Sequence, residues 1–165
     1  WQRAAHDPLT GLPNRGHFRD RLQQAVQRAA EMGRQLGVMF VDVDRFKQVN
    51  DEFGHDVGDR LLIEIARRMG TALREADFVG RLGGDEFAVL LDPLSHAEDA
   101  NVVARKIEQA VSAPLAVDGR RSILPRISLG LSLYPDAGTT ADELLRSADQ
   151  AMYAVKRARQ EAGPG

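Results

Sequence analysis

The sequence predicts an α+β domain in which helices flank a mixed or antiparallel central sheet. Leu36–Val43 and Phe87–Leu91 are apolar on both faces, which is typical of strands buried within a sheet. The segments Leu62–Leu73 and Leu144–Val155 instead repeat apolar residues every three or four positions, as amphipathic helices do. The order of predicted elements, β-α-α-β-β-α-β-α with hairpins, favours a sheet backed by helices over a doubly wound sheet.

The N-terminal part of the chain predicts a turn and a helix before the first strand. We expect residues 1–6 to be the end of a linker helix that enters from upstream. Asp7–Arg15 contains the prolines and glycine that punctuate turns. Apolar residues then recur at helical spacing until Gly33, where we expect the helix to end: Phe18, Leu22, Val26 and Ala29.

Turn and cap signals predict the remaining elements. A short helix and a glycine-containing loop are expected over 44–59, and Asp59 lies near the start of the next helix, where a carboxylate is favoured. Gly83-Gly84 predicts a hairpin turn, because glycine adopts positive φ without steric cost. We also expect a helix over Ala97–Val111, a surface hairpin within 112–126 that turns at Asp118-Gly119, a strand over Ile127–Pro135, and a capping box of Thr140 and Glu143.

The composition is that of one globular domain. The chain has 165 residues, of which 43% are hydrophobic and 28% are charged. Its formal net charge of -2 provides no basic field to recruit nucleic acid, so any phosphate binding must be local. The absence of cysteine excludes disulfides and thiolate metal sites. No apolar run is long enough to span a bilayer, and we expect a cytoplasmic domain cut from a longer protein.

Carboxylates stand where predicted strands meet turns. Asp42 and Asp44 close one strand and, as alternate residues, can point to the same face. Asp85 and Glu86 follow the glycine turn at the start of another strand. If the two strands are neighbours, Asp42, Asp85 and Glu86 form one cluster, whose oxygen ligands suit Mg²⁺ or Mn²⁺. Glycines beside such a cluster leave room for a polyphosphate, as metal-assisted nucleotidyl transfer requires.

Taken together, the motifs resemble those of one family. DPLTGLPNR, DVDRFKQVNDEFGHDVGD, RLGGDEF, SLG and ADQAMYAVK occur in the order and spacing of the GGDEF family, the diguanylate cyclases. The resemblance covers essentially the whole chain and assigns residues 7–160 to the domain and 161–165 to a C-terminal tail. It implies a fold similar to the palm of adenylyl cyclases and polymerases, and the condensation of two GTP molecules into cyclic di-GMP.

The resemblance also implies roles for individual residues. In the catalytic centre, Asp42 and Asp85 are expected to hold the metal with the Val43 carbonyl. Glu86 is expected to ligate metal or to help deprotonate the attacking 3′-hydroxyl. Asn50 and Asp59 are expected to bind guanine, and Lys47 and Lys156 to contact phosphates. Gly83 and Gly84 are expected to let the nucleotide approach the backbone.

Guanine is the base that suits Asn50 and Asp59. An ionised Asp59 accepts from N1–H and N2–H, while the Asn50 amide donates to O6. Adenine would leave these polar groups unpaired. Singly, Asn50 is equally a helix-end residue, Asp59 an N-cap, Asp44 a cap of the following helix, and each lysine a surface residue. Their joint spacing favours the nucleotide site.

A second constellation, Arg74-x-x-Asp77, lies just before the glycine turn. On its own, such a pair is usually a local ion pair at a helix end. By resemblance it is an inhibitory site for the product, in which the arginine forks onto phosphate or guanine acceptors. Arg105 or Lys106 is then expected to supply a basic partner.

One block departs from the family pattern. Gln160 stands where a phosphate-binding arginine is expected, with Arg159 and Arg157 as the candidates to replace it, whereas Lys156 is retained. This departure puts the contacts to the triphosphate in question and leaves the metal centre untouched.

The resemblance also implies partners. Catalysis is expected to need a homodimer, because the product requires two GTP molecules that face each other. An upstream sensor domain is implied, and the PLAVDGR hairpin is similar to that of members followed by a phosphodiesterase domain. The alternative is a catalytically weak domain that binds GTP or cyclic di-GMP and regulates a neighbouring phosphodiesterase or effector domain. A purely structural domain would leave the acidic cluster unexplained.

Overall fold

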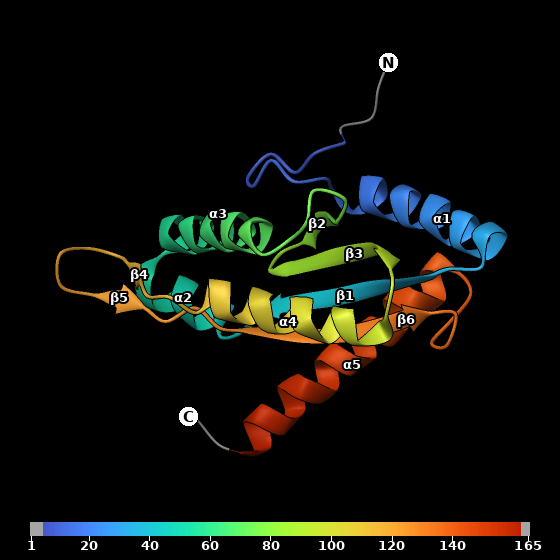
Figure 1. Cartoon of the computed structure of the whole chain (residues 1–165). Helices are drawn as coiled ribbons and strands as arrows, with labels where there is room; N and C mark the ends of the chain where they lie inside the picture. Colours follow the sequence, from blue (N-terminus) through green and yellow to red (C-terminus); the bar gives the residue numbers. More distant parts are fainter. Residues whose placement is uncertain (1–4, 163–165) are drawn as a thin grey trace.

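The computed structural model describes residues 5–162 and contains a four-stranded sheet with helices on both faces (Figure 1). The elements are α1 (Arg15–Met32), β1 (Gln35–Val43), α2 (Phe46–Phe53), α3 (His55–Thr71), β2 (Phe78–Gly83), β3 (Glu86–Leu94), α4 (Ala97–Val111), β4 (Leu115–Ala116), β5 (Ser122–Ile123), β6 (Ile127–Tyr134) and α5 (Ala141–Glu161). The main sheet has the strand order β2-β3-β1-β6, and each neighbouring pair is antiparallel. The predicted α+β class is confirmed, and the sheet is antiparallel.

β1 lies inside the sheet because its residues are apolar on both faces. All of its residues except the first are buried. Met39 and Val41 pack in the core beneath α3 and α4, whereas Val38 and Phe40 pack in the core beneath α1 and α5. Successive strand residues point to opposite faces, so Asp42 continues the second series and faces α5.

Local sequence signals set the ends of two long helices. At the start of α1, the side chain of Asn14 accepts the His17 N–H at 3.0 Å. α1 ends at Met32, and Gly33 follows with a left-handed φ of 65°. Before α5, the Thr140 hydroxyl accepts the Glu143 N–H at 3.2 Å. The predicted end of the first helix and the predicted capping box are therefore confirmed.

Two predictions about helix ends are wrong. Residues 1–4 lie outside the described part of the chain, but Ala5 and His6 are not helical. The proline-containing turn folds this segment back on itself, so that His6 forms an isolated bridge with Pro13. The helix that contains Asp59 begins earlier than predicted, at His55, because Gly54, with φ 93°, turns the chain directly from α2 into α3. Asp59 therefore lies in the second turn of α3.

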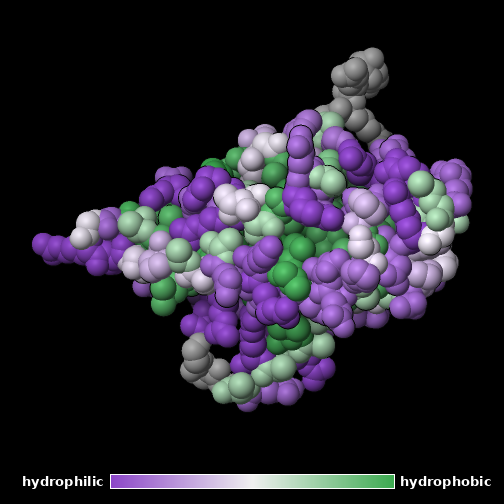
Figure 2. All heavy atoms as spheres, viewed as in Figure 1, coloured by the Kyte–Doolittle hydropathy of each residue, from purple (hydrophilic) through white to green (hydrophobic). Residues whose placement is uncertain are grey.

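The predicted surface hairpin is formed by β4 and β5, which project from the body as an arm (Figure 1). Asp118 accepts the N–H groups of Arg120 and Arg121 at its turn. Arg60 and Arg68 of α3 donate to backbone carbonyls at its base. The tip of this arm is hydrophilic in Figure 2. Across residues 5–162, no helix combines the length and the apolar character that crossing a membrane would need.

Candidate active site

The predicted catalytic carboxylates lie at one edge of the main sheet, where β1 ends and β3 begins. Asp42 is opposite Glu86 in the β1–β3 register, and the Val43 N–H donates to the Asp85 carbonyl at 3.2 Å. Opposite residues of an antiparallel pair share a face, so Asp42 and Glu86 project together. The antiparallel pairing therefore brings the two acidic motifs side by side.

The glycine turn leaves the backbone open beside these carboxylates. Gly83 and Gly84 have φ values of 145° and 48°, a region that side chains rarely adopt. Among the described residues, no atom lies within 4 Å of the place that a Cβ would take at either glycine. Backbone conformation, and not crowding, therefore requires glycine here, and a ligand can approach the turn from outside.

Burial and crowding raise the pKa values of two carboxyl groups in this site. The pKa of Asp85 rises to about 7, first because the group is buried and then because the Asp42 carboxyl is hydrogen-bonded to it and carries like charge. The pKa of Glu86 is raised by burial and by the charges of Asp42 and Asp149. The carboxylates of Asp42 and Asp85 therefore repel each other when both groups are ionised.

Lys156 of α5 provides part of the compensating charge. Its ammonium group donates to Asp42 Oδ2. Burial works against the charged lysine, but the hydrogen bond and the charge of Asp42 outweigh it and raise the pKa of Lys156. Asp42 Oδ1 is buried and has no hydrogen-bond donor when Asp85 is ionised. One acceptor of this site thus remains unsatisfied by the protein.

These residues fit a divalent cation. A cation between Asp42 and Asp85 would satisfy the unpartnered oxygen and remove the repulsion, and Mg²⁺ commonly takes only one or two protein carboxylates beside waters and phosphates. Within residues 5–162, no three His, Cys, Asp or Glu side chains gather closely enough to hold a metal. The predicted three-carboxylate cluster is corrected to a close pair, Asp42 and Asp85, with Glu86 alongside.

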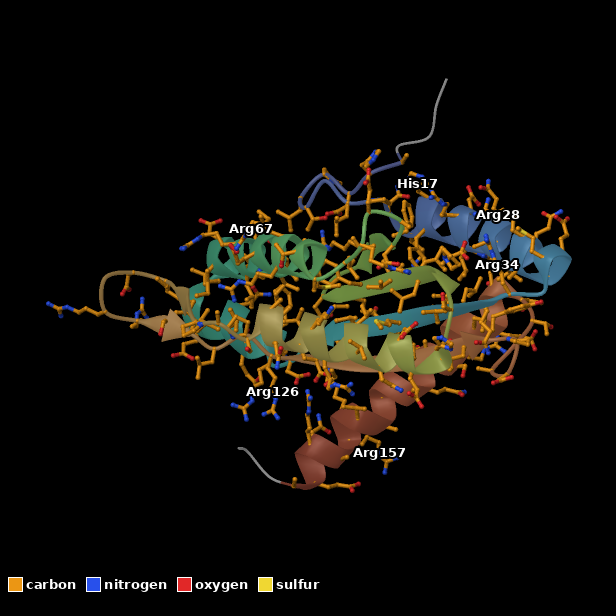
Figure 3. The ribbon with its side chains drawn as sticks, viewed as in Figure 1. His17, Arg28, Arg34, Arg67, Arg126 and Arg157 are labelled. Atoms are coloured by element: carbon orange, nitrogen blue, oxygen red, sulfur yellow. The ribbon has the colours of Figure 1, made fainter. Side chains whose placement is uncertain are left out.

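A groove of ≈ 1360 Å³ opens next to the pair, between α2, residues 122–126 and the end of α5. The predicted site residues that line it are Val43, Lys47, Asp85 and Lys156, together with Gln160 and the candidate arginine Arg159. Arg126, labelled in Figure 3, is also part of its wall. A second hollow of ≈ 340 Å³ lies between α1 and the start of α5 and is lined by none of the predicted site residues. Of these two hollows, only the large groove borders Asp85 and Lys156.

The residues predicted to bind guanine lie where α2 and α3 meet. The Asn50 side chain packs against Gly58, where a Cβ would lie 1.8 Å from Asn50 Oδ1. That oxygen is buried and has no hydrogen-bond partner. Asp59 follows Gly58 and is exposed. α3 therefore presents one ionisable acceptor to solvent beside a polar atom that the protein leaves unpaired.

Arg74 and Asp77 form a closed ion pair between α3 and β2. The Arg74 Nη2 group donates to Asp77 Oδ1 at 2.7 Å and to the Pro93 carbonyl at 3.0 Å. The hydrogen bond with Asp77 raises the pKa of Arg74. The predicted basic partners, Arg105 and Lys106, are exposed on α4. A ligand would have to reorganise this pair in order to use it.

The arginines near Gln160 differ in their surroundings. Arg157 is 62% exposed, pairs only loosely with Glu161 at 3.7 Å, and points away from the sheet in Figure 3. Arg157 is not among the residues that line the groove. Arg159 faces the body and donates to Asp44 at 2.9 Å. The prediction that Asp44 caps α2 is wrong, because no side chain caps that helix.

Comparison with known proteins identifies the family. The family model described as "Diguanylate cyclase, GGDEF domain" matches residues 4–162. The chain belongs to this family. The GGDEF motif itself is the Gly83–Phe87 segment, which contains the open turn and two of the crowded carboxylates.

Relatives of this GGDEF domain support the same family. It is 47% identical over 154 residues to "Diguanylate cyclase TpbB" from Pseudomonas aeruginosa, and 45% identical over 155 residues to the bifunctional diguanylate cyclase/cyclic di-GMP phosphodiesterase MucR from that organism. These alignments cover 93% and 94% of the chain but only 35% and 22% of the relatives. The chain therefore spans a minor part of the relatives' length.

Solved structures share the fold. The GGDEF domain of TpbB superposes with a TM-score of 0.90 at 46% identity, covering 93% of this chain and 89% of that one. The GGDEF domain of DgcB from Caulobacter crescentus, solved in complex with c-di-GMP, gives 0.87 at 29% identity, covering 96% and 93%.

Sequence reasoning missed the residues that hold the glycine turn of this GGDEF domain. Arg81 donates to the Gly84 carbonyl at 2.7 Å and to Asp7 at 2.9 Å. Arg15 donates to the Leu82 carbonyl at 3.1 Å. Asp7 and Arg15 delimit the DPLTGLPNR motif, so the available signal was a turn segment with a charge at each end.

Proposed function

We propose that this GGDEF domain condenses two molecules of GTP into cyclic di-GMP with release of pyrophosphate. The observation that carries the proposal is the crowded Asp42–Asp85 pair, with its unpartnered oxygen, beside the open glycine turn. A site whose charges are satisfied only by an added cation suits a substrate that arrives with a metal. The 47% identity to a protein named diguanylate cyclase supports the same activity.

The metal would be Mg²⁺ or Mn²⁺, held by Asp42, Asp85 and the Val43 carbonyl, with Glu86 beside them as a proton acceptor. When bound, it supplies positive charge to the phosphate at which the new bond forms. Lys156 and Lys47 line the groove and would orient the phosphates. The raised pKa of Glu86 brings this carboxylate closer to the range in which it can take a proton at neutral pH.

Base selection would depend on α2 and α3. The exposed Asp59 carboxylate would accept the two guanine donors, and the Asn50 amide would pair with O6. Gly58 supports this arrangement because any larger residue would displace Asn50. Gly83 and Gly84 would let the nucleotide approach the backbone.

Catalysis would require two chains. One chain contains one Asp42–Asp85 pair, whereas the product needs two nucleotides with each 3′-hydroxyl directed at the other's phosphate. A twofold pair of domains supplies this arrangement. Turnover per chain should therefore rise with protein concentration, and a rate that stays constant on dilution of a monomeric sample would contradict this part of the proposal.

Regulation would use the Arg74–Asp77 pair, with Arg105 or Lys106 as a further contact to bound product. The DgcB structure supports product binding by a domain of this family. An upstream sensor domain and a downstream phosphodiesterase domain would be the partners in a longer protein, and MucR offers a precedent for the second.

The test is incubation of the purified chain with GTP and Mg²⁺, followed by separation of the nucleotides. We expect cyclic di-GMP and pyrophosphate from the wild type, and none with ATP or without a divalent cation. GTP that remains unchanged at high protein concentration would overturn the proposal.

A catalytically weak regulatory domain is the second candidate, because uncharged Gln160 stands in the groove beside Lys156. That function predicts binding of GTP or cyclic di-GMP without turnover. Equilibrium binding measured beside the turnover assay distinguishes the two candidates.

A further inference from the structure

Two ion pairs join the end of α5 to the end of β1. Lys156 pairs with Asp42, and Arg159, one helical turn later, pairs with Asp44. Residues three apart on a helix share a face, and Asp44 lies in the turn directly after β1, so the two pairs form successive rungs between α5 and this end of β1. Only the first rung belongs to the proposed metal centre.

In the second rung, one guanidinium nitrogen of Arg159 and both carboxylate oxygens of Asp44 have hydrogen-bond partners within the protein. Arg159 Nη1 donates to Asp44 Oδ2 at 2.9 Å, to the Ile127 carbonyl at 2.6 Å and to Ser128 Oγ at 3.3 Å. Its Nη2 lies 3.7 Å from Glu108. Ser128 donates to the remaining oxygen, Asp44 Oδ1, at 2.7 Å. The side chains of Arg159 and Asp44 are only 29% and 15% exposed.

Asp44 also fixes the turn that leads into α2. Its backbone N–H donates to the Arg126 carbonyl at 2.8 Å, so both its main chain and its side chain are tied to the start of β6. The next residue, Arg45, has φ 59° and ψ 26°, a left-handed conformation that is unfavourable for a non-glycine residue. Such a conformation persists when surrounding contacts determine it. Lys47 follows in the first turn of α2 and lines the groove.

We infer that Arg159 is a positioning residue, which acts through Asp44 to hold both lysine-bearing walls of the groove, and not a phosphate ligand that replaces the arginine missing at position 160. On one side the rung fixes the turn of α5 that carries Lys156. On the other it fixes the strained turn before Lys47. The kinetic consequence rests on the proposed function, whereas the structural coupling does not.

The decisive experiment is a double-mutant cycle of Asp44→Ala and Arg159→Ala, read by binding of a non-hydrolysable GTP analogue with Mg²⁺. A positioning role predicts that each single variant weakens binding by about tenfold and that the double variant is no weaker than the worse single, since both remove one unit. A phosphate ligand predicts the opposite sign for Asp44→Ala, because loss of its partner would release Arg159 to the phosphates. Binding as tight as or tighter than wild type in Asp44→Ala would overturn the inference.

The same four proteins are compared by urea unfolding, which needs no nucleotide. Strongly non-additive changes in the free energy of unfolding, with weaker nucleotide binding in each single variant, support the coupling between Asp44 and Arg159. Additive effects in both assays overturn it. If Asp44→Ala does not fold, Asp44→Asn keeps the shape and an acceptor for Ser128 while it loses the charge. Arg146→Ala removes an exposed arginine from the same helix and should leave binding within about twofold of wild type.

The two failures are distinguishable. A wild-type chain that produces no cyclic di-GMP, combined with a coupled unfolding cycle, would remove the proposed function and keep the rung. A chain that turns over GTP, combined with additive variants, would keep the function and remove the rung.

Discussion

The charged side chains at the two ends of the β2–β3 hairpin differ in how completely the protein supplies them with partners. At the glycine-turn end, Asp85 has its pKa raised to about 7 and Asp42 keeps a buried oxygen without a donor. At the other end, the side chain of Asp77 is wholly buried and accepts hydrogen bonds from both the backbone and the guanidinium of Arg74. Both ends contain charged groups, but Arg74 and Asp77 satisfy each other directly, whereas Asp42 and Asp85 are two carboxyl groups placed side by side.

This difference separates a site that awaits a ligand from a pair that is already closed. Unsatisfied buried carboxylates cost free energy, and a bound cation would recover it. An ion pair whose hydrogen bonds are already made can bind a ligand only by replacing some of those hydrogen bonds with contacts to the ligand. The catalytic end is therefore expected to respond to metal, and the Arg74 end to bind product at the expense of its internal hydrogen bonds.

The largest effect should come from a substitution at the glycine-turn end of the hairpin. Glu86→Gln keeps the shape of the side chain but removes a group proposed to take a proton, so turnover should fall by about 10²–10⁴-fold. The measurement is initial rate of cyclic di-GMP formation, with urea unfolding as the control for the fold. Turnover close to that of wild type would show that Glu86 has no part in the reaction.

At the other end of the hairpin, Arg74→Ala should relieve product inhibition and leave turnover unchanged. Loss of a forked, charge-assisted contact of about 1.5–3 kcal/mol corresponds to roughly 10–150-fold weaker inhibition. Progress curves with and without added cyclic di-GMP measure this. Equal inhibition of wild type and variant would leave Arg74–Asp77 as a structural pair alone. Lys106→Ala tests whether α4 takes part.

Asp59 belongs to neither end and tests whether base selection is independent of both. Asp59→Asn replaces an acceptor with a group that also carries donors, which should weaken GTP binding by about 1–3 kcal/mol. Metal-dependent binding of inorganic pyrophosphate should remain unchanged. If wild type binds ATP and GTP equally, the guanine assignment fails.

The smallest effect concerns stability against pH. The folded pKa of Asp85 lies above its ordinary value of 3.8, so its contribution to stability is fully present below that value, falls as the pH rises, and is lost once the pH passes about 7. Asp85→Asn should therefore flatten the dependence of unfolding free energy on pH over this range. Mg²⁺ should stabilise the wild type above pH 7 more than it stabilises the variant. Parallel pH curves for the two proteins would contradict the crowded-pair interpretation.

Much of the fold and part of the site could be predicted from the sequence. Hydrophobic periodicity located α1 and its end before Gly33, and the capping box located the start of α5, because both signals depend on neighbouring residues. The family prediction is confirmed by the match over residues 4–162. The predicted start of α3 was wrong because a glycine such as Gly54 can end one helix or precede the next, and periodicity alone does not distinguish these choices.

The sequence by itself determined which residue types stand at strand ends and turns, since those patterns are local: Asp42 at the end of β1, glycines at a positive-φ turn, Lys156 on an amphipathic helix. Tertiary structure decided which of them are partners. Lys156 pairs with Asp42 across 114 positions, Arg159 with Asp44 across 115, and Arg81 with Asp7 across 74. Burial and proximity, which raise the pKa of Asp85 and close the Arg74–Asp77 pair, arise only when the sheet and helices pack, because electrostatic interactions depend on distance and solvent exclusion.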